Sequence, residues 1–257
     1  MEQLKIKNLV VKSENKMLVK SINIEVEKGK ILAVVGKSGS GKTITFKAAT
    51  GLLSSEKFEI TGEILWNEKI YAPNEMQGFL GREISYVMQN PMTAFNPVFT
   101  IGSHCRETLM QHLKVNKKES EKIIKEWFEK FGLQDTQRIL QSYSYELSGG
   151  MLQRVMLSLA MAVGSKMIIA DEPTTALDTI TQKEIILAFQ RLNEEYGVTI
   201  VFISHDFAIV SQIAHHMVVI SDGRRIEYGK TKDVLMTPQS ALTKKMLKEL
   251  IENDYDY

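Results

Sequence analysis

The sequence contains one cysteine and no apolar run of the roughly 18 residues that a membrane-spanning helix needs. The single thiol, Cys105, excludes an intramolecular disulfide, and we expect it to be a small, partly buried apolar residue in a chain kept in a reducing compartment. The N-terminal residues 1–16 carry charges where a secretory signal would have its apolar segment. The net charge of +1 argues against a nucleic-acid binder that works by neutralising phosphates.

Apolar residues make up 44% of the 257 residues, enough for a sizeable core. The segments 4–11 and 19–26 alternate apolar and polar side chains, which is typical of half-buried strands. The run ILAVV at 31–35 is continuous and bounded by glycine, which indicates a strand buried on both faces of a parallel sheet. Further strands are expected at 58–66, 83–88, 167–170 and 198–203, followed by a hairpin over 217–229 that turns at Asp222-Gly223.

Helices are expected from Gly41 to Ala49, from Lys117 to Gly132 and from Gly150 onward. In the second of these, Ile, Trp and Phe side chains follow one helical face, which predicts core packing. No repeat or long linker divides the chain. We therefore expect one composite domain over 1–257, with an α/β core and an antiparallel β portion in 1–88 and 166–257, and a helical subdomain in 89–165.

Residues 36–43, GKSGSGKT, match the phosphate-binding pattern G-x-x-x-x-G-K-[ST] in full. Glycines permit close approach of the backbone, so that amide N–H groups can converge on phosphate oxygens at the positive end of the following helix. Lys42 can reach the β- and γ-phosphates of ATP, and the Thr43 hydroxyl can coordinate Mg²⁺. A chance glycine-rich turn is the alternative, but the motif follows a buried strand and precedes a helix as required. The predicted nucleotide-binding residues are Gly36, Lys37, Ser38, Gly39, Ser40, Gly41, Lys42 and Thr43.

Two acidic residues end the apolar segment MIIADEP at 167–173. The carboxyl ends of parallel strands are where α/β sheets bind ligands, so Asp171 is predicted to hold Mg²⁺, directly or through water. Glu172 is then placed to polarise the attacking water or accept its proton. The alternative is an acidic turn stopped by Pro173. The long interval between Thr43 and Asp171 predicts a substantial insertion.

Within that insertion, residues 147–162 read LSGGMLQRVMLSLAMA, and this segment resembles the signature segment of ABC transporter ATPases. Gln89 resembles the Q-loop glutamine, Asp178 in ALD (176–178) the D-loop aspartate, and His205 in FISHD the switch histidine. The resemblance covers about residues 3–245. It implies an α/β fold: a P-loop NTPase (RecA-like) core with an antiparallel β subdomain and an inserted α-helical subdomain.

The resemblance also implies roles for these side chains, with ATP and Mg²⁺ as cofactors. Gln89 would assist Glu172 in catalysis and contact the Mg²⁺, and His205 would contact the γ-phosphate and the attacking water. The signature residues would meet ATP held by an opposite subunit; they are Leu147, Ser148, Gly149, Gly150 and Met151. A helix N-terminus with free amides suits such an anion, although a helix start without a ligand is the plainer alternative.

The segment QNPMTAFNPVFTIG (89–102), together with Met151, resembles the branch of peptide and nickel importers. The resemblance implies that the chain forms a heterodimer with a second, homologous ATPase subunit, rather than a homodimer. It also implies two transmembrane permease subunits as partners, a solute-binding protein that contacts the chain only indirectly, and no binding to nucleic acid. It implies a peripheral location on the cytoplasmic face of the membrane. The single cysteine excludes an iron–sulfur tail, and the short C-terminal part favours nickel or metal chelates over short peptides.

The family usually stacks adenine on an aromatic residue shortly after the first strand, yet KSENK at 12–16 contains none. We therefore expect weak ATP affinity or relaxed specificity for the base. Two other classes of protein are alternatives: a soluble ABC-type ATPase of translation or DNA repair, and a small-molecule kinase. A soluble ABC-type ATPase of that kind usually has two ATPase units, coiled coils or zinc motifs. A small-molecule kinase does not need the LSGGM and FISHD segments.

Overall fold

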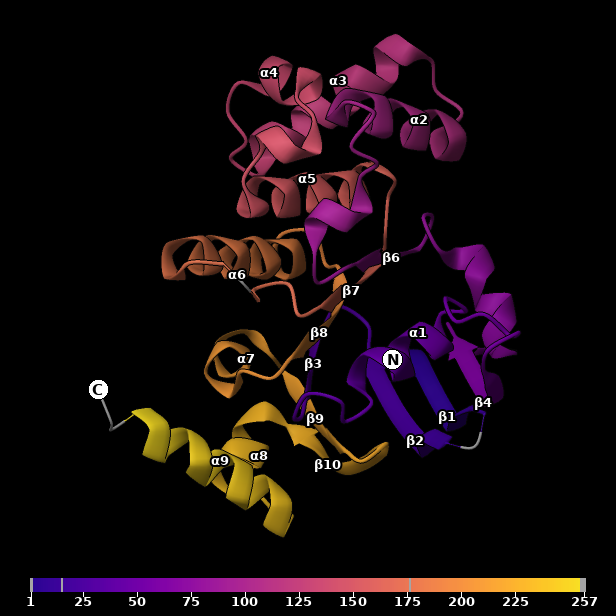
Figure 1. Cartoon of the computed structure of the whole chain (residues 1–257), viewed down its shortest axis with the longest axis vertical. Helices are drawn as coiled ribbons and strands as arrows, with labels where there is room; N and C mark the ends of the chain where they lie inside the picture. Colours follow the sequence, from indigo (N-terminus) through magenta and orange to yellow (C-terminus); the bar gives the residue numbers. More distant parts are fainter. Residues whose placement is uncertain (1, 15, 176, 255–257) are drawn as a thin grey trace. The chain divides into compact units, whose positions relative to one another are not determined.

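A computed structural model describes residues 2–14, 16–175 and 177–254 (Figure 1). These residues form two compact units. Unit 1 is drawn from Met1–Phe79 and Thr199–Tyr257, and unit 2 from Leu80–Val198. Ala176 of the ALD segment lies outside the described residues. None of the helices in the described part of the chain has both the length and the apolar composition needed to cross a membrane.

Unit 1 contains an antiparallel sheet with the strand order β2-β1-β4-β5. Its strands are β1 (Glu2–Ser13), β2 (Lys16–Glu27), β4 (Glu59–Trp66) and β5 (Lys69–Tyr71). The side chains of Ile22 and Ile24 are fully buried, whereas Ser21 and Asn23, which alternate with them along the strand, are exposed. This alternation is what half-buried strands require, and it confirms the strands predicted at 4–11, 19–26 and 58–66. The sequence pattern did not predict the short β5.

The second set of strands in unit 1 is centred on β3 (Ile31–Val35), which pairs in parallel with both β8 (Thr199–Ser204) and β9 (His216–Ser221). All residues of β3 are buried, as its continuous apolar run predicted. All residues of β8, which was predicted as a strand at 198–203, are buried as well. β9 and β10 (Arg224–Lys230) form the expected antiparallel hairpin. Its turn residues Asp222 and Gly223 have φ values of 48° and 68°, the positive angles that suit a tight hairpin.

Helices of unit 1 follow these strands. The bounds are α1 (Lys42–Ala49), the 3₁₀ turn η1 (Pro73–Phe79), α7 (Phe207–Ile213), α8 (Thr231–Met236) and α9 (Ala241–Asp254). α1 packs against β1 and β2 (Figure 1), and Phe46 on α1 is fully buried there. The predicted helix over 41–49 is therefore confirmed to within one residue.

Unit 2 contains two parallel strands, β6 (Ile84–Val87) and β7 (Met167–Asp171). Its helices are α2 (Ile101–Leu113), α3 (Lys117–Lys130), α4 (Thr136–Gln141), α5 (Gly149–Ala162) and α6 (Thr179–Glu194), with 3₁₀ turns η2 (Pro91–Ala94) and η3 (Ser144–Glu146). In Figure 1, α2, α3 and α4 gather on one side of α5, and α6 lies on its other side. Of these, α3 and α5 were predicted as helices.

The apolar face of α3 packs into the core of this helical group, where Ile124 and Phe128 are fully buried. Trp127 is partly buried, and its ring contacts Tyr196 beneath the Lys130 ammonium. Cys105 lies in the same core and is fully buried, rather than partly buried as expected. Burial raises the pKa of its thiol to about 12, so the residue acts as a small apolar side chain.

Candidate nucleotide site

The loop 36–43 leaves the carboxyl end of β3 and enters α1. Gly36, Gly39 and Gly41 have φ values of 156°, 75° and 104°, in the region that favours glycine. A Cβ added at Gly36 would lie 2.1 Å from the carbonyl oxygen of Ile220, so close approach of the two backbones excludes a side chain there. Lys37, Ser38 and Gly39 form the exposed tip of the loop.

The β9–β10 turn supports this loop from within unit 1. The Gly223 amide donates to the carbonyl oxygen of Ser40 at 2.9 Å, and its own carbonyl accepts from the Lys20 amide at 2.7 Å. A Cβ at Gly223 would lie 2.4 Å from the carbonyl oxygen of Leu18. The Lys20 ammonium also pairs with Asp222 at 2.6 Å. The sequence predicted a hairpin here, but not its contact with the loop.

Two buried groups in the loop fit an anion. Lys42 is 4% exposed, and its ammonium donates to the carbonyl oxygens of Gly36 at 2.8 Å and Lys37 at 3.2 Å. The buried hydroxyl of Ser40 has no hydrogen-bond partner among the described residues, and such a group costs stability unless something satisfies it. Thr43 lies in the first turn of α1. A cation, hydroxyls and loop amides at a helix start are the donors that a triphosphate requires.

His205 follows β8 at the edge where the loop leaves β3. The register pairs Val35 with Ser204, the last residues of the two parallel strands, so that Gly36 and His205 leave the sheet at the same level. Asp206 fixes the chain beyond this point by accepting from the amides of Ala208 and Ile209 at the start of α7. Unit 1 therefore brings loop 36–43 and His205 to the same edge of these strands.

In unit 2, Asp171 is the last residue of β7 and is 4% exposed. The hydroxyl of Tyr86 on β6 donates to its Oδ2 atom at 2.9 Å. Burial first, and the adjacent carboxylate second, raise the pKa of the Tyr86 phenol, so this hydroxyl stays protonated and remains a donor. Tyr86 was not among the predicted site residues, because nothing in the sequence around it indicates a carboxylate 85 residues away.

Glu172 leaves the strand in a left-handed conformation, with a φ of 47°. Such backbone angles cost about 1–3 kcal/mol in a non-glycine residue and gather at functional sites. Its Oε2 atom accepts from the Gln89 amide at 3.4 Å and from the Thr175 hydroxyl at 3.1 Å. The structure thus brings together Gln89 and Glu172, two of the predicted catalytic residues, and adds Thr175, which the sequence analysis did not name.

The signature segment begins α5. Ser148 is exposed and caps the helix by accepting from the Met151 amide at 3.3 Å, while Leu147 before it is buried. A Cβ added at Gly150 would lie 2.3 Å from the Cγ2 atom of Thr181 on α6. Glycine at 150 therefore permits the starts of α5 and α6 to approach closely.

Asp178, the predicted D-loop residue, caps α6. It accepts from the amides of Ile180 and Thr181, both at 3.0 Å, and from the Thr181 hydroxyl at 2.6 Å. These hydrogen bonds, that of the hydroxyl first, lower the pKa of the exposed carboxyl. In the described chain, Asp178 is thus ionised and holds the start of the helix that packs against Gly150.

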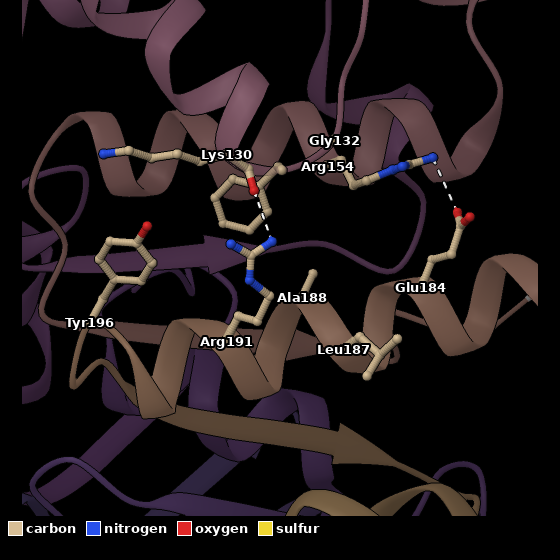
Figure 2. A pocket seen from close by; sticks show the side chains of 9 residues that line it. Lys130, Gly132, Arg154, Glu184, Leu187, Ala188, Arg191 and Tyr196 are labelled. Carbon is tan, nitrogen blue, oxygen red and sulfur yellow. Dashed lines mark hydrogen bonds and ion pairs between the residues drawn. The ribbon is translucent and has the colours of Figure 1, made fainter.

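A pocket of about 250 Å³ lies further along α5 and α6, beside the end of α3 (Figure 2). Leu187 and Ala188 contribute apolar lining, and Arg191 crosses it to donate to the carbonyl oxygen of Lys130 at 3.1 Å. At one end Arg154 on α5 pairs with Glu184 on α6 at 3.3 Å. None of the predicted site residues lines this pocket. Its ion pair links the helix that begins with the signature to the helix that Asp178 caps.

Mg²⁺ is bound in nucleotide sites by one or two protein oxygens together with substrate phosphates. Among the described residues no group of three or more His, Cys, Asp or Glu side chains could hold a metal ion. The oxygens of Thr43 in unit 1, and of Asp171 and Gln89 in unit 2, are of the hard type that Mg²⁺ prefers. Within each unit, the donor atoms are therefore of a kind that can serve a Mg²⁺ ion arriving with a triphosphate.

The family model described as ABC transporter matches residues 19–175, and the chain belongs to this family. It is an ATP-binding and ATP-hydrolysing subunit of that family, and its fold is that of a P-loop ATPase cassette. A dimeric, post-hydrolysis structure of the ATP-binding cassette MJ0796 bound to ADP and Pi is 26% identical, with a TM-score of 0.76, covering 89% of this chain and 98% of that chain.

Two curated relatives bear on the branch of the family. The metal-staphylopine import system ATP-binding protein CntD of Staphylococcus aureus is 42% identical, over 90% of this chain and 86% of its own length. The dipeptide transport ATP-binding protein DppD of Bacillus subtilis is 36% identical, over 89% of this chain and 70% of its own length. The resemblance to importer ATPases drawn from the motifs is therefore confirmed.

Proposed function

We propose that this chain energises the import of a metal chelate, rather than of short peptides, by hydrolysing Mg-ATP at the cytoplasmic face of a membrane. The higher identity to the metal-staphylopine import protein than to the dipeptide protein supports this choice. A role in translation or DNA repair has no support from these relatives, which serve import and transport systems.

The catalytic part of this proposal is supported by the hydrogen bond between Gln89 and Glu172 beyond the end of β7. In the proposed reaction Glu172 accepts a proton from water while the water oxygen bonds to the γ-phosphorus. The bond from that phosphorus to the bridging oxygen of ADP then breaks. Gln89 orients the water, and His205 donates a hydrogen bond to the γ-phosphate.

Loop 36–43 binds the triphosphate through its amides and the Lys42 ammonium. Mg²⁺, when bound with the nucleotide, neutralises charge on the β- and γ-phosphates. Thr43, Asp171 and Gln89 are the residues proposed to hold it. The proposal requires both units to contact the same nucleotide. Unit 1 would contribute loop 36–43 and His205, and unit 2 would contribute Asp171 and Glu172.

The proposed working form is a pair of ATPase subunits, this chain and a second, homologous one, together with two transmembrane permeases that a solute-binding protein supplies. The signature residues 147–151 would cover ATP held by the partner, with Asp178 at the same contact. ATP then favours the closed pair because it contacts both subunits only in that state. The division into a core (1–88 and 166–257) and a helical subdomain (89–165) remains part of this proposal.

The experiment that tests the catalytic assignment is Glu172→Gln in the assembled transporter. Loss of a general base costs about 10²–10⁴ in rate, so ATP should bind normally and turn over that much more slowly. Glu126→Gln, on the exposed face of α3, is the matched control and should retain the wild-type rate. Near-normal turnover by Glu172→Gln would remove Glu172 from the catalytic role.

Substrate class is tested in proteoliposomes that contain the complete transporter. Solute-binding protein loaded with a metal chelate should stimulate ATP hydrolysis, whereas a dipeptide should leave the basal rate unchanged. Stimulation by the dipeptide alone would reverse the proposed choice of substrate and leave the catalytic assignment intact.

A further inference from the structure

Tyr86 and Asp171 are brought together by the register of two neighbouring strands. β6 and β7 run in parallel and pair Tyr86 with Ile169 and Val87 with Ala170. Because side chains alternate along a strand, Tyr86 lies on the same face of the sheet as Ile169 and as Asp171, two residues further on. Two residues of a strand rise about 6.6 Å, a distance that a phenol can span and a serine or threonine hydroxyl cannot.

The contact is a buried one with a fixed direction. The Tyr86 hydroxyl donates to Asp171 Oδ2 at 2.9 Å, and the aspartate side chain is almost wholly enclosed. An ionised carboxylate only accepts hydrogen bonds, so the phenol proton must lie toward it. A hydrogen bond weakens steeply when its donor and acceptor depart from a near-linear geometry. This bond therefore restricts rotation of the carboxylate at the strand end.

We propose that Tyr86 is a positioning residue, whose hydroxyl orients the Asp171 carboxylate for the Mg²⁺ that accompanies ATP. The inference rests on the proposed metal role of Asp171 and deepens it. Residues that orient a metal ligand typically change metal affinity by about 10–100-fold when they are removed. Loss of the hydroxyl should therefore weaken metal binding. The affinity of loop 36–43, which lies in unit 1, for the nucleotide should stay unchanged.

A purely structural role is the competing explanation, because a hydrogen bond from β6 to the end of β7 also stabilises the strand pair. The chain offers a matched control on the same strand. Ser85 on β6 donates to or accepts from the Ser165 hydroxyl at 2.6 Å, just before β7. Ser85→Ala removes a side-chain hydrogen bond beside the same two strands without touching the carboxylate.

The test uses the full chain with Mn²⁺ as the metal probe and a non-hydrolysable ATP analogue. Bound Mn²⁺ is measured by electron paramagnetic resonance, and the melting temperature is recorded for each variant. Tyr86→Phe keeps the ring and should weaken Mn²⁺ binding about tenfold, while Ser85→Ala binds Mn²⁺ like the wild type. Analogue affinity in the absence of metal should be the same in all three proteins.

Three outcomes overturn the inference. Wild-type Mn²⁺ affinity in Tyr86→Phe, beside clear loss in Asp171→Asn, would show that Asp171 meets the metal without needing Tyr86. An equal loss in Ser85→Ala would show that strand stability alone is responsible. Wild-type affinity in Asp171→Asn would refute the metal role of Asp171 itself, a failure of the proposed site that the first two outcomes do not share.

Discussion

Substituting alanine for Gly36 should disable the phosphate loop while most of the fold survives. The new Cβ would lie 2.1 Å from the Ile220 carbonyl oxygen and 2.7 Å from the Ser40 hydroxyl. Carbon and oxygen atoms in favourable contact stay about 3.3–3.6 Å apart. The loop must therefore move by about 1 Å away from the end of β9.

A displacement of about 1 Å would lengthen amide-to-phosphate hydrogen bonds from about 2.9 Å to about 3.9 Å, which is beyond hydrogen-bond range. Each hydrogen bond lost to a charged group costs about 1.5–3 kcal/mol of binding free energy. We expect Gly36→Ala to bind ATP about 100-fold more weakly. Overpacking of this kind costs about 1–3 kcal/mol, and each kcal/mol lowers the melting temperature by about 2–4 °C in chains of 150–250 residues. The variant should remain folded at 25 °C.

Gly39→Ala is the matched control. Gly39 also has a left-handed backbone, with a φ of 75°, but an added Cβ meets nothing within 4 Å. Only the conformational cost of about 1–2 kcal/mol applies, so ATP affinity should fall by no more than about 30-fold. Titration of a fluorescent ATP analogue by anisotropy, together with thermal melts followed by circular dichroism, measures both quantities. Equal affinities of Gly36→Ala and the wild type would refute the close approach of β9 to the loop.

Three further predictions concern other parts of the chain. Lys42→Ala should lose most nucleotide affinity, and unchanged ATP binding by calorimetry would contradict the assignment of the loop. Gly150→Ala should slow ATP turnover in the assembled transporter about 10–100-fold without changing ATP binding by the isolated chain, because the new Cβ would lie 2.3 Å from Thr181 Cγ2. Thr181→Ser deletes that methyl group and should restore part of the turnover rate. If Thr181→Ser restores none of the rate, this contact is not the cause. Burial raises the pKa of Cys105 to about 12, so the thiol stays protonated at pH 8. It should therefore react with Ellman's reagent only after denaturation. Rapid labelling of the native protein would contradict the burial of Cys105.

The sequence predicted the parts of the molecule that depend on local pattern. β3 was predicted because it is a continuous apolar run, and α3 because its apolar side chains follow one helical face. The phosphate loop and the signature segment were identified by contiguous residues. Short or polar elements such as α4 and β5 escaped notice, because their patterns are too brief to identify.

Features that depend on the pairing of distant segments could not be predicted in this way. The hydrogen bond from Tyr86 to Asp171 follows from the β6–β7 register, and the support of Ser40 by Gly223 follows from the hairpin lying beneath the loop. Neither register nor approach distance is encoded in a local motif. The left-handed backbone of Glu172 was equally hidden, since glutamate is not a residue that favours positive φ.

ATP hydrolysis by the proposed mechanism requires Lys42 and Glu172 to serve the same nucleotide. A crystal structure of the Glu172→Gln variant with ATP and Mg²⁺ tests it directly, because slow hydrolysis preserves the triphosphate. We predict that loop 36–43 encloses the β- and γ-phosphates, and that the side chain at position 172 lies within reach of a water facing the γ-phosphate. A triphosphate bound by the loop with position 172 on a remote surface would contradict the account.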